Sequence, residues 1–175
     1  MKPSVFSWAT LTTALGMGSL ALALVSPASA ANYIQTKSID FAGSACAAAS
    51  VNSSGNSDII MIFRNWRSVG NDRSNCAISI PVKVPRGVQV GLPTVTYKGY
   101  STPALLTSEV FFAGDLTTAK KISVKNTFTK IDKTIAWSGC GEAVNIRVNA
   151  ALMTDYGSGR INSITLSKLP TRACR

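Results

Sequence analysis

Residues 76–84 alternate between apolar and other side chains, and no other feature constrains the fold of this chain as strongly. One face of the segment carries only apolar side chains, namely Cys76, Ile78, Ile80, Val82 and Val84. A period of two is that of a β-strand, in which successive side chains point to opposite faces. Pro81 has no backbone N–H to donate, so we expect this strand to lie at a sheet edge or to turn that nitrogen outward.

Turn signals and further strand-like segments follow at short intervals. Pro85-Arg86-Gly87 and Tyr97-Lys98-Gly99-Tyr100 predict two turns, with strands over Val88–Tyr97 and Leu105–Phe112 next to them. Other strands are expected at residues 59–63, 121–128, 134–137, 143–154 and 161–169. The pattern predicts an all-β fold, an antiparallel β-sandwich or jelly roll of about eight strands.

The first thirty residues have the three parts of a secretory signal peptide. Lys2 precedes an apolar run from about Ala14 to Val25, and Ala28-Ser29-Ala30 supplies a cleavage site. The alternative is an uncleaved anchor, but this run is shorter than the roughly 20 residues that a spanning helix needs. We expect residues 1–30 to be a signal peptide and residues 31–175 to form one secreted domain, extracellular or periplasmic, with no integral membrane segment after cleavage.

Four cysteines, an even number, lie in the expected mature chain: Cys46, Cys76, Cys140 and Cys174. In an exported protein an even count predicts disulfides, here two. A zinc site is the alternative, but the chain has no closely spaced cysteine pair and no histidine. Of the three possible pairings we prefer Cys46 with Cys140 and Cys76 with Cys174, because antiparallel first and last edges would bring the second pair together.

A strong positive charge predicts either a polyanionic partner or protected strand edges. Without Lys2, 17 of the 18 basic residues remain against 8 acidic ones, which leaves about nine net positive charges. Such a charge attracts acidic polymers, and lysines on a strand edge also discourage aggregation. If the charge serves binding, the partner is polysaccharide or another polyanion; if it serves solubility and edge protection, it implies no partner. Nucleic acid is not expected as a partner of an exported protein.

Two segments are candidate ligand surfaces. Arg64, Trp66 and Arg67 place an aromatic ring among guanidinium groups, an arrangement that suits stacking on a sugar, although Trp66 at the end of the core is the alternative. The second segment is rich in lysine and contains Lys120, Lys121, Lys125, Lys130 and Lys133. Its alternative is an exposed edge strand with a solvated loop.

Several short motifs occur in an order that resembles a known family. They are Arg73-x-x-Cys76, Pro85-x-Gly87, Tyr97-x-Gly99-Tyr100, Phe111-Phe112-x-Gly114, Trp137-Ser138-x-Cys140-Gly141 and the terminal Cys174. In order and spacing they are similar to a family of small exported bacterial and fungal proteins, the domain of unknown function number four-three-six-zero. The resemblance covers nearly the whole mature chain and implies an exported, disulfide-bearing, all-β protein. It implies no ligand and no activity.

The residue types present exclude several kinds of catalysis. Without histidine there is no Ser-His-Asp or Cys-His mechanism and no histidine-ligated metal, and no cofactor motif is present. A pair of carboxylates is the remaining route, as in glycoside hydrolysis, with Asp72 and Glu109 as the best candidates. We predict a non-enzymatic extracellular or envelope interaction module, with polysaccharide or polyanion binding as its alternative and a carboxylate glycoside hydrolase as the third possibility.

Overall fold

The computed structural model describes residues 38–46, 49–53 and 58–175. The predicted signal peptide and the beginning of the expected domain lie outside these ranges. In the ranges described, no helix is both long and apolar enough to cross a membrane.

Strands make up most of the described chain, and every strand pair is antiparallel. In chain order the strands are β1 (Asp40–Ala42), β2 (Ala49–Ser53), β3 (Ile59–Phe63), β4 (Arg67–Val69), β5 (Arg73–Val82), β6 (Val88–Val90), β7 (Val95–Phe112), β8 (Lys120–Asp132), β9 (Val144–Thr154), β10 (Ser158–Leu166) and β11 (Thr171–Ala173). The predicted all-β fold is confirmed, with additional short strands that the sequence pattern did not reveal. The strand expected at residues 134–137 is wrong, because this segment forms only an isolated bridge between Trp137 and Gly91.

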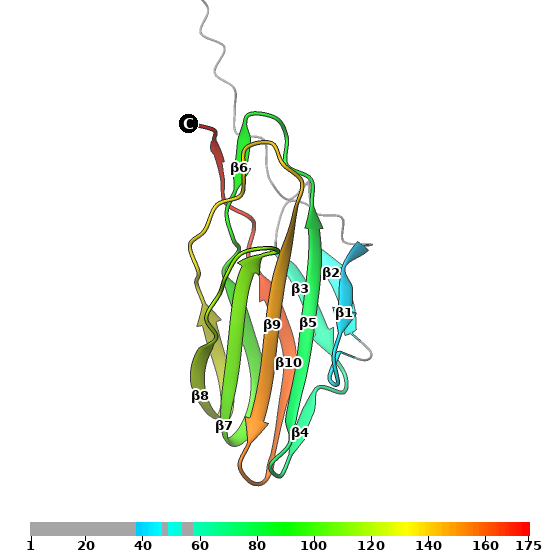
Figure 1. The fold of residues 1–175 in the computed structure, drawn as a ribbon. Helices are drawn as coiled ribbons and strands as arrows, with labels where there is room; N and C mark the ends of the chain where they lie inside the picture. The colour runs from blue at the N-terminus through cyan, green and yellow to red at the C-terminus, as the bar shows by residue number, and fades with distance from the viewer. Residues whose placement is uncertain (1–37, 47–48, 54–57) are drawn as a thin grey trace, which may run out of the picture.

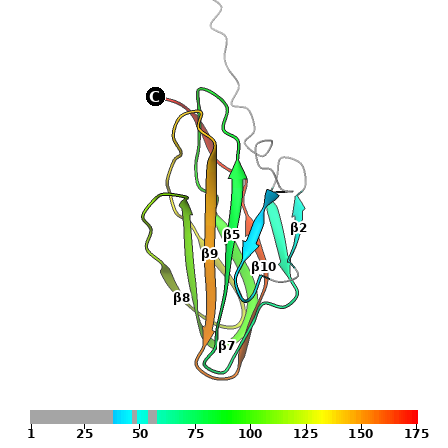
Figure 2. The ribbon, with the colours of Figure 1, turned by 45° about the vertical axis from the view of Figure 1, so that its right-hand side comes forward.

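One continuous sheet, in the order β1-β5-β9-β7-β10-β3-β2, folds into two layers because β7 belongs to both. Residues 104–112 of β7 pair with β9 in the front layer, and residues 95–101 pair with β10 in the rear layer. Figures 1 and 2 show β5 and β9 in front of β10. β8 follows β7 through both layers, and β4 pairs with β10 in the rear layer. The architecture is therefore the expected antiparallel sandwich.

The β7–β8 hairpin bends where it passes from one layer to the other. The register of the two strands shifts between Ser101 and Ala104, so an extra residue of β7 lies opposite β8. Pro103 lies in this shift, where a missing N–H costs no ladder bond. On the opposite strand Asn126 has a φ of 55°, a left-handed conformation that asparagine tolerates better than most residues. A β-bulge of this kind increases the local twist and bends the strand.

The turn predicted at Tyr97–Tyr100 is wrong, because this segment lies inside β7. Gly99 pairs with Ile161 on one side and with Phe128 on the other. A Cβ atom at Gly99 would collide with the backbone oxygen of Arg160 and would lie 2.7 Å from Cζ of Phe128. The glycine therefore makes room for an aromatic ring that covers the strand. In the sequence, a glycine in this packing role cannot be told from a glycine in a turn.

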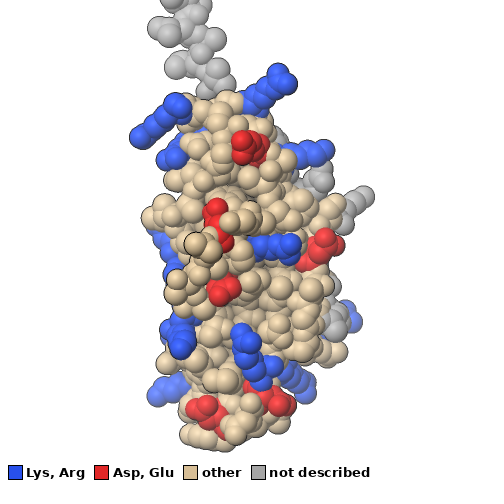
Figure 3. Space-filling view, in the orientation of Figure 1, with Lys and Arg blue, Asp and Glu red and all other residues tan. Residues whose placement is uncertain are grey.

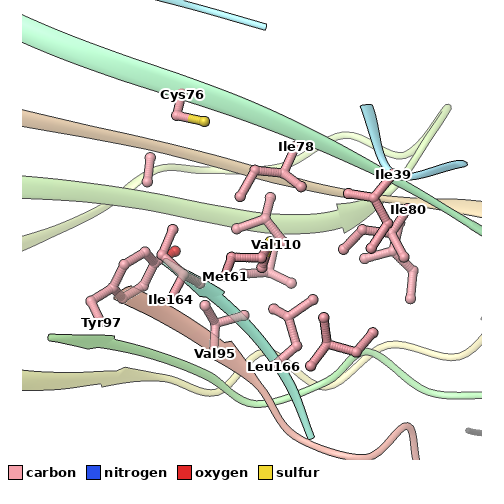
Figure 4. Packing of buried hydrophobic residues seen from close by; sticks show 14 of the residues in the cluster. Ile39, Met61, Cys76, Ile78, Ile80, Val95, Tyr97, Val110, Ile164 and Leu166 are labelled. Atoms are coloured by element: carbon pink, nitrogen blue, oxygen red, sulfur yellow. The ribbon is translucent and has the colours of Figure 1, made fainter. Parts of the chain in front are cut away.

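The core lies between the two layers, where side chains from both meet (Figure 4). β5 contributes Ile78 and Ile80, β3 contributes Met61, and β10 contributes Ile164, all fully buried. The alternation predicted for residues 76–84 is confirmed over β5, which is buried on its inner face. Neighbouring β1 pairs only with Ala77–Ser79, so at Pro81 the strand is an edge, as its proline requires.

Two disulfides are present, but the preferred pairing is wrong. The bonds join Cys46 to Cys76 and Cys140 to Cys174. Cys46 follows a tight turn after β1, which brings it back to β5, the strand that β1 pairs with. Cys140 and Cys174 meet because the segments that carry them both bind to β6. The backbone N–H of Gly141 donates to the Val88 oxygen, and β11 pairs with β6. This small second sheet, which the sequence pattern did not predict, decides the pairing.

Candidate functional site

A row of exposed side chains crosses the outer face of the rear layer. Arg67 on β4 lies directly opposite Arg160 on β10, and Arg160 lies directly opposite Tyr100 on β7. Opposite residues of neighbouring strands share a face, so these three side chains, which we call the basic row, are adjacent. Lys98 lies two residues from Tyr100 on the same face of β7. The row lines a shallow hollow of about 380 Å³.

The charge of this outer face is unbalanced. Its exposed or half-buried outward positions on β3, β4, β10 and the adjoining halves of β7 and β8 hold no aspartate or glutamate: they are Ile60, Ile62, Arg67, Val69, Thr96, Lys98, Tyr100, Thr127, Thr129, Ile131, Ser158, Arg160, Ser163 and Thr165. Within the described ranges neither Arg67 nor Arg160 forms an ion pair. Like charges directly opposite each other destabilise a sheet, so the fold itself gives no reason for this pair of arginines.

Only part of the predicted Arg64–Arg67 surface exists. Trp66 is 1 % exposed and packs edge-on against Phe63 with ring centroids 4.9 Å apart, so its predicted place on a ligand surface is wrong. Arg64 and Arg67 are exposed. The exposed aromatic side chain in the row of Arg67 is instead Tyr100, which lies on the far side of Arg160 and is 45 % exposed. Had residues 97–100 been recognised as part of a strand, the two-residue spacing of Tyr100 from Lys98 would have predicted that both side chains lie on one exposed face.

The five predicted lysines do not form one surface. Lys125 and Lys130 line a hollow of about 740 Å³ at the bend of the β7–β8 hairpin, whereas Lys133 lines a different hollow of about 350 Å³. Lys120 is held in an ion pair with Asp132. Among the described strands β8 pairs with β7 alone, so its other edge has no partner strand there. Exposed lysines on this strand fit the protection of an edge against intermolecular pairing.

A buried network of polar side chains links β7 and β8 inside their bent hairpin. Tyr97 Oη and Ser108 Oγ are 2.7 Å apart, and Ser108 Oγ donates to Asp132 Oδ2 at 2.6 Å. Lys120 Nζ donates to Asp132 Oδ1 and, at 2.8 Å, to Thr134 Oγ1. Burial raises the pKa of the Tyr97 phenol far above its ordinary value; the bond with Ser108 lowers it, and the negative charge of Asp132 raises it further. Buried polar groups linked in this way hold one another in place.

This network predicts an alkaline loss of stability. Below a pH of about 10 Tyr97 is protonated in both states, whereas above it the unfolded chain releases a proton that the fold retains. The free energy of unfolding should therefore fall as the pH rises from about 10, by at most about 1.4 kcal/mol per pH unit from this group. Urea unfolding at several alkaline pH values should show a weaker fall in Tyr97→Phe. Tyr156→Phe, at an exposed tyrosine, should behave as the wild type; equal falls in all three proteins would contradict the assignment.

The two candidate catalytic carboxylates are not brought together. Asp72 is exposed in the turn before β5, where its backbone oxygen accepts a bond from Ser68. Glu109 lies near the end of β7 and accepts a 3.0 Å bond from Asn149 Nδ2. The hollow that Glu109 lines contains no second carboxylate. Glycosidases of the retaining type need two carboxyl groups about 5–5.5 Å apart, and these two residues share no such hollow. Among the residues described, no group of three or more potential acidic, cysteine or histidine metal ligands occurs.

Comparison with known proteins gives a family and distant structural neighbours. A family model described as a domain of unknown function (DUF4360) matches residues 32–171. None of the curated proteins compared with the chain matches it. Among solved structures, TmCBM61 in complex with beta-1,4-galactotriose is 11 % identical, with 81 % of this chain and 86 % of that one covered and a TM-score of 0.32. A structure of accessory secretory protein 1, 2 and 3 in Streptococcus pneumoniae is 11 % identical (75 % and 95 % covered, TM-score 0.31), and PfGH50B is 8 % identical (79 % and 23 % covered, TM-score 0.31).

Proposed function

Since the chain belongs to the DUF4360 family, whose description assigns no function, we propose a function from the molecule itself: an exported, non-enzymatic module that binds anionic polysaccharide through the basic row. The observation that carries the proposal is the direct opposition of Arg67 and Arg160, on strands whose described outward positions hold no acidic side chain. An anion between the two guanidinium groups would turn their repulsion into attraction.

The chemistry of the row suits an acidic sugar. Guanidinium groups bind carboxylate and sulfate oxygens in a planar, bidentate manner, and such charge-assisted bonds are stronger than neutral ones. Tyr100 adds a half-exposed ring beside Arg160, which can cover the apolar face of a sugar while its hydroxyl group stays in water. The three side chains extend from paired strands rather than loops, so their backbone positions are fixed before binding.

Two features support an exported location. Both disulfides join residues far apart in the chain, with separations of 30 and 34 residues. Such bonds form and persist in oxidising compartments and are rare in the cytosol. Together with the predicted signal peptide, they favour a protein that acts outside the cytoplasm, where acidic polysaccharides are available as partners.

Affinity electrophoresis with polygalacturonate and heparin as probes tests the proposal. Arg67→Ala/Arg160→Ala should weaken binding about tenfold or more, because two charge-assisted contacts are lost. Arg86→Ala/Lys83→Ala, at exposed residues away from the row, removes the same charge and serves as the control. The affinity of the wild type should fall steeply with salt.

The contrast between the two double variants is decisive. Equal weakening in both would mean that net charge alone attracts the polymer. No binding of either probe at low salt would refute the proposed function.

A further inference from the structure

We infer that the outer face of the front layer carries a second binding site, for an uncharged sugar chain. Two hollows, of about 280 and 380 Å³, lie next to each other there. Asn149 lines both, so together they form one trough along β7 and β9. We call it the front trough and define it by Arg73, Thr107, Glu109, Phe111, Arg147 and Asn149.

The register of the central strands places these side chains side by side. Glu109 lies opposite Asn149, and Phe111 lies opposite Arg147. Small residues leave the space beside them: Ala77 is the partner of Asn149 on β5 and lines the first hollow. The trough is therefore a gap in the side-chain layer above an intact sheet.

The polar groups of the trough match hydroxyl groups better than ions. Asn149 Nδ2 donates to Glu109 Oε2 at 3.0 Å, and this bond fixes both side chains. Among the described residues, Glu109 Oε1 and Asn149 Oδ1 have no protein donor, and the Arg73 guanidinium has no protein acceptor. Acceptors and donors without a protein partner thus line the same hollow. A hydroxyl group both donates and accepts hydrogen bonds, so a ligand with several hydroxyl groups can satisfy the acceptors and the donors.

The front trough differs from the basic row in carrying charges of both signs. Figure 3 shows that the front face carries acidic and basic side chains intermixed. An anionic ligand in the trough would meet Glu109, and a cationic one would meet Arg73 and Arg147. An uncharged ligand avoids both repulsions.

An apolar surface completes the site. The Phe111 side chain is half-buried and lines the second hollow beside Asn149. Ligand sites typically combine an aromatic or apolar surface with a few fixed polar groups that set orientation. The backbone of the trough is held in place because β9 pairs with β5 on one side and with β7 on the other along this stretch.

The inference does not depend on the basic row, and its test uses different probes. Affinity electrophoresis of the full mature chain in gels containing uncharged galactan, β-glucan, xylan or mannan should show retardation by at least one polymer. Asn149→Ala and Glu109→Ala should each weaken that retardation about tenfold. Asn71→Ala, at an exposed asparagine in the turn before β5, is the matched control and should bind as the wild type.

Two further variants separate the possible causes. Glu109→Gln keeps an acceptor oxygen and the side-chain shape, so it should bind better than Glu109→Ala. Arg67→Ala/Arg160→Ala should retain full binding of the uncharged polymer. The inference is overturned if none of the four polymers retards the wild type, or if Asn149→Ala, with an unchanged melting temperature, binds as well as Asn71→Ala.

Discussion

Asp132→Ala should lower the free energy of unfolding by about 3 kcal/mol, the upper end of the cost of leaving a buried donor without its acceptor. The Asp132 side chain is fully buried and accepts bonds from Ser108, Lys120 and Thr134. Without it, the Ser108 hydroxyl loses its acceptor inside the core, and Ser108 is no longer held in place as the hydrogen-bond partner of Tyr97. Equilibrium urea unfolding measures the loss.

Asp115→Ala is the matched control for this change, because Asp115 is exposed in the turn after β7 and has no side-chain bond among the described residues. It should change stability by less than about 0.5 kcal/mol. Lys120→Ala should have an intermediate effect, since Lys120 is partly exposed and water can replace its ammonium group. A loss below about 1 kcal/mol in Asp132→Ala would show that the network is not a source of stability.

Gly99→Ala should be at least as damaging, with an expected loss of about 3 kcal/mol or more, at the upper end of what overpacking a core costs. The new methyl group would meet the Arg160 backbone and the Phe128 ring at once. The ring can move, but the backbone oxygen belongs to the paired strand β10, so β7 and β10 would have to separate locally. Thermal unfolding and the yield of folded protein are the measurements.

A second substitution identifies the source of this clash. Phe128→Leu combined with Gly99→Ala should recover only part of the stability, because the contact with the Arg160 oxygen remains. Full recovery of the stability would mean that the Phe128 ring is the only reason why a glycine is needed at position 99. Lys98→Ala, one residue away and exposed, should leave the melting temperature unchanged.

The sequence predicted those elements in which local pattern and burial agree. β5 is recognisable because its inner face is buried along nearly its whole length, so a period of two is visible in the residues themselves. The two disulfides were likewise predictable in number. Their partners were not, because β6 and β11 have only three residues each, too few to show a period, and their pairing depends on a long-range contact.

The candidate sites depended even more on long-range pairing. Arg67 and Arg160 are 93 positions apart and become neighbours only through the register of β4 with β10. Trp66 and Tyr100 show the corresponding difficulty for aromatic residues, since composition cannot tell which ring is buried. In the front trough, Glu109 was identified as a carboxylate worth attention, but its partner Asn149 lies on a strand that the pattern could not pair with β7.

The passage of β7 through both layers has a mechanical consequence. A force that pulls the two layers of a sandwich apart acts against the interdigitating side chains of its core. Here the same pull would also act along the covalent backbone of β7 and on its ladder with β8, which spans the bend. A polymer held on the rear face and another on the front face would therefore load one continuous hairpin, and the layers could separate only after that hairpin had come apart.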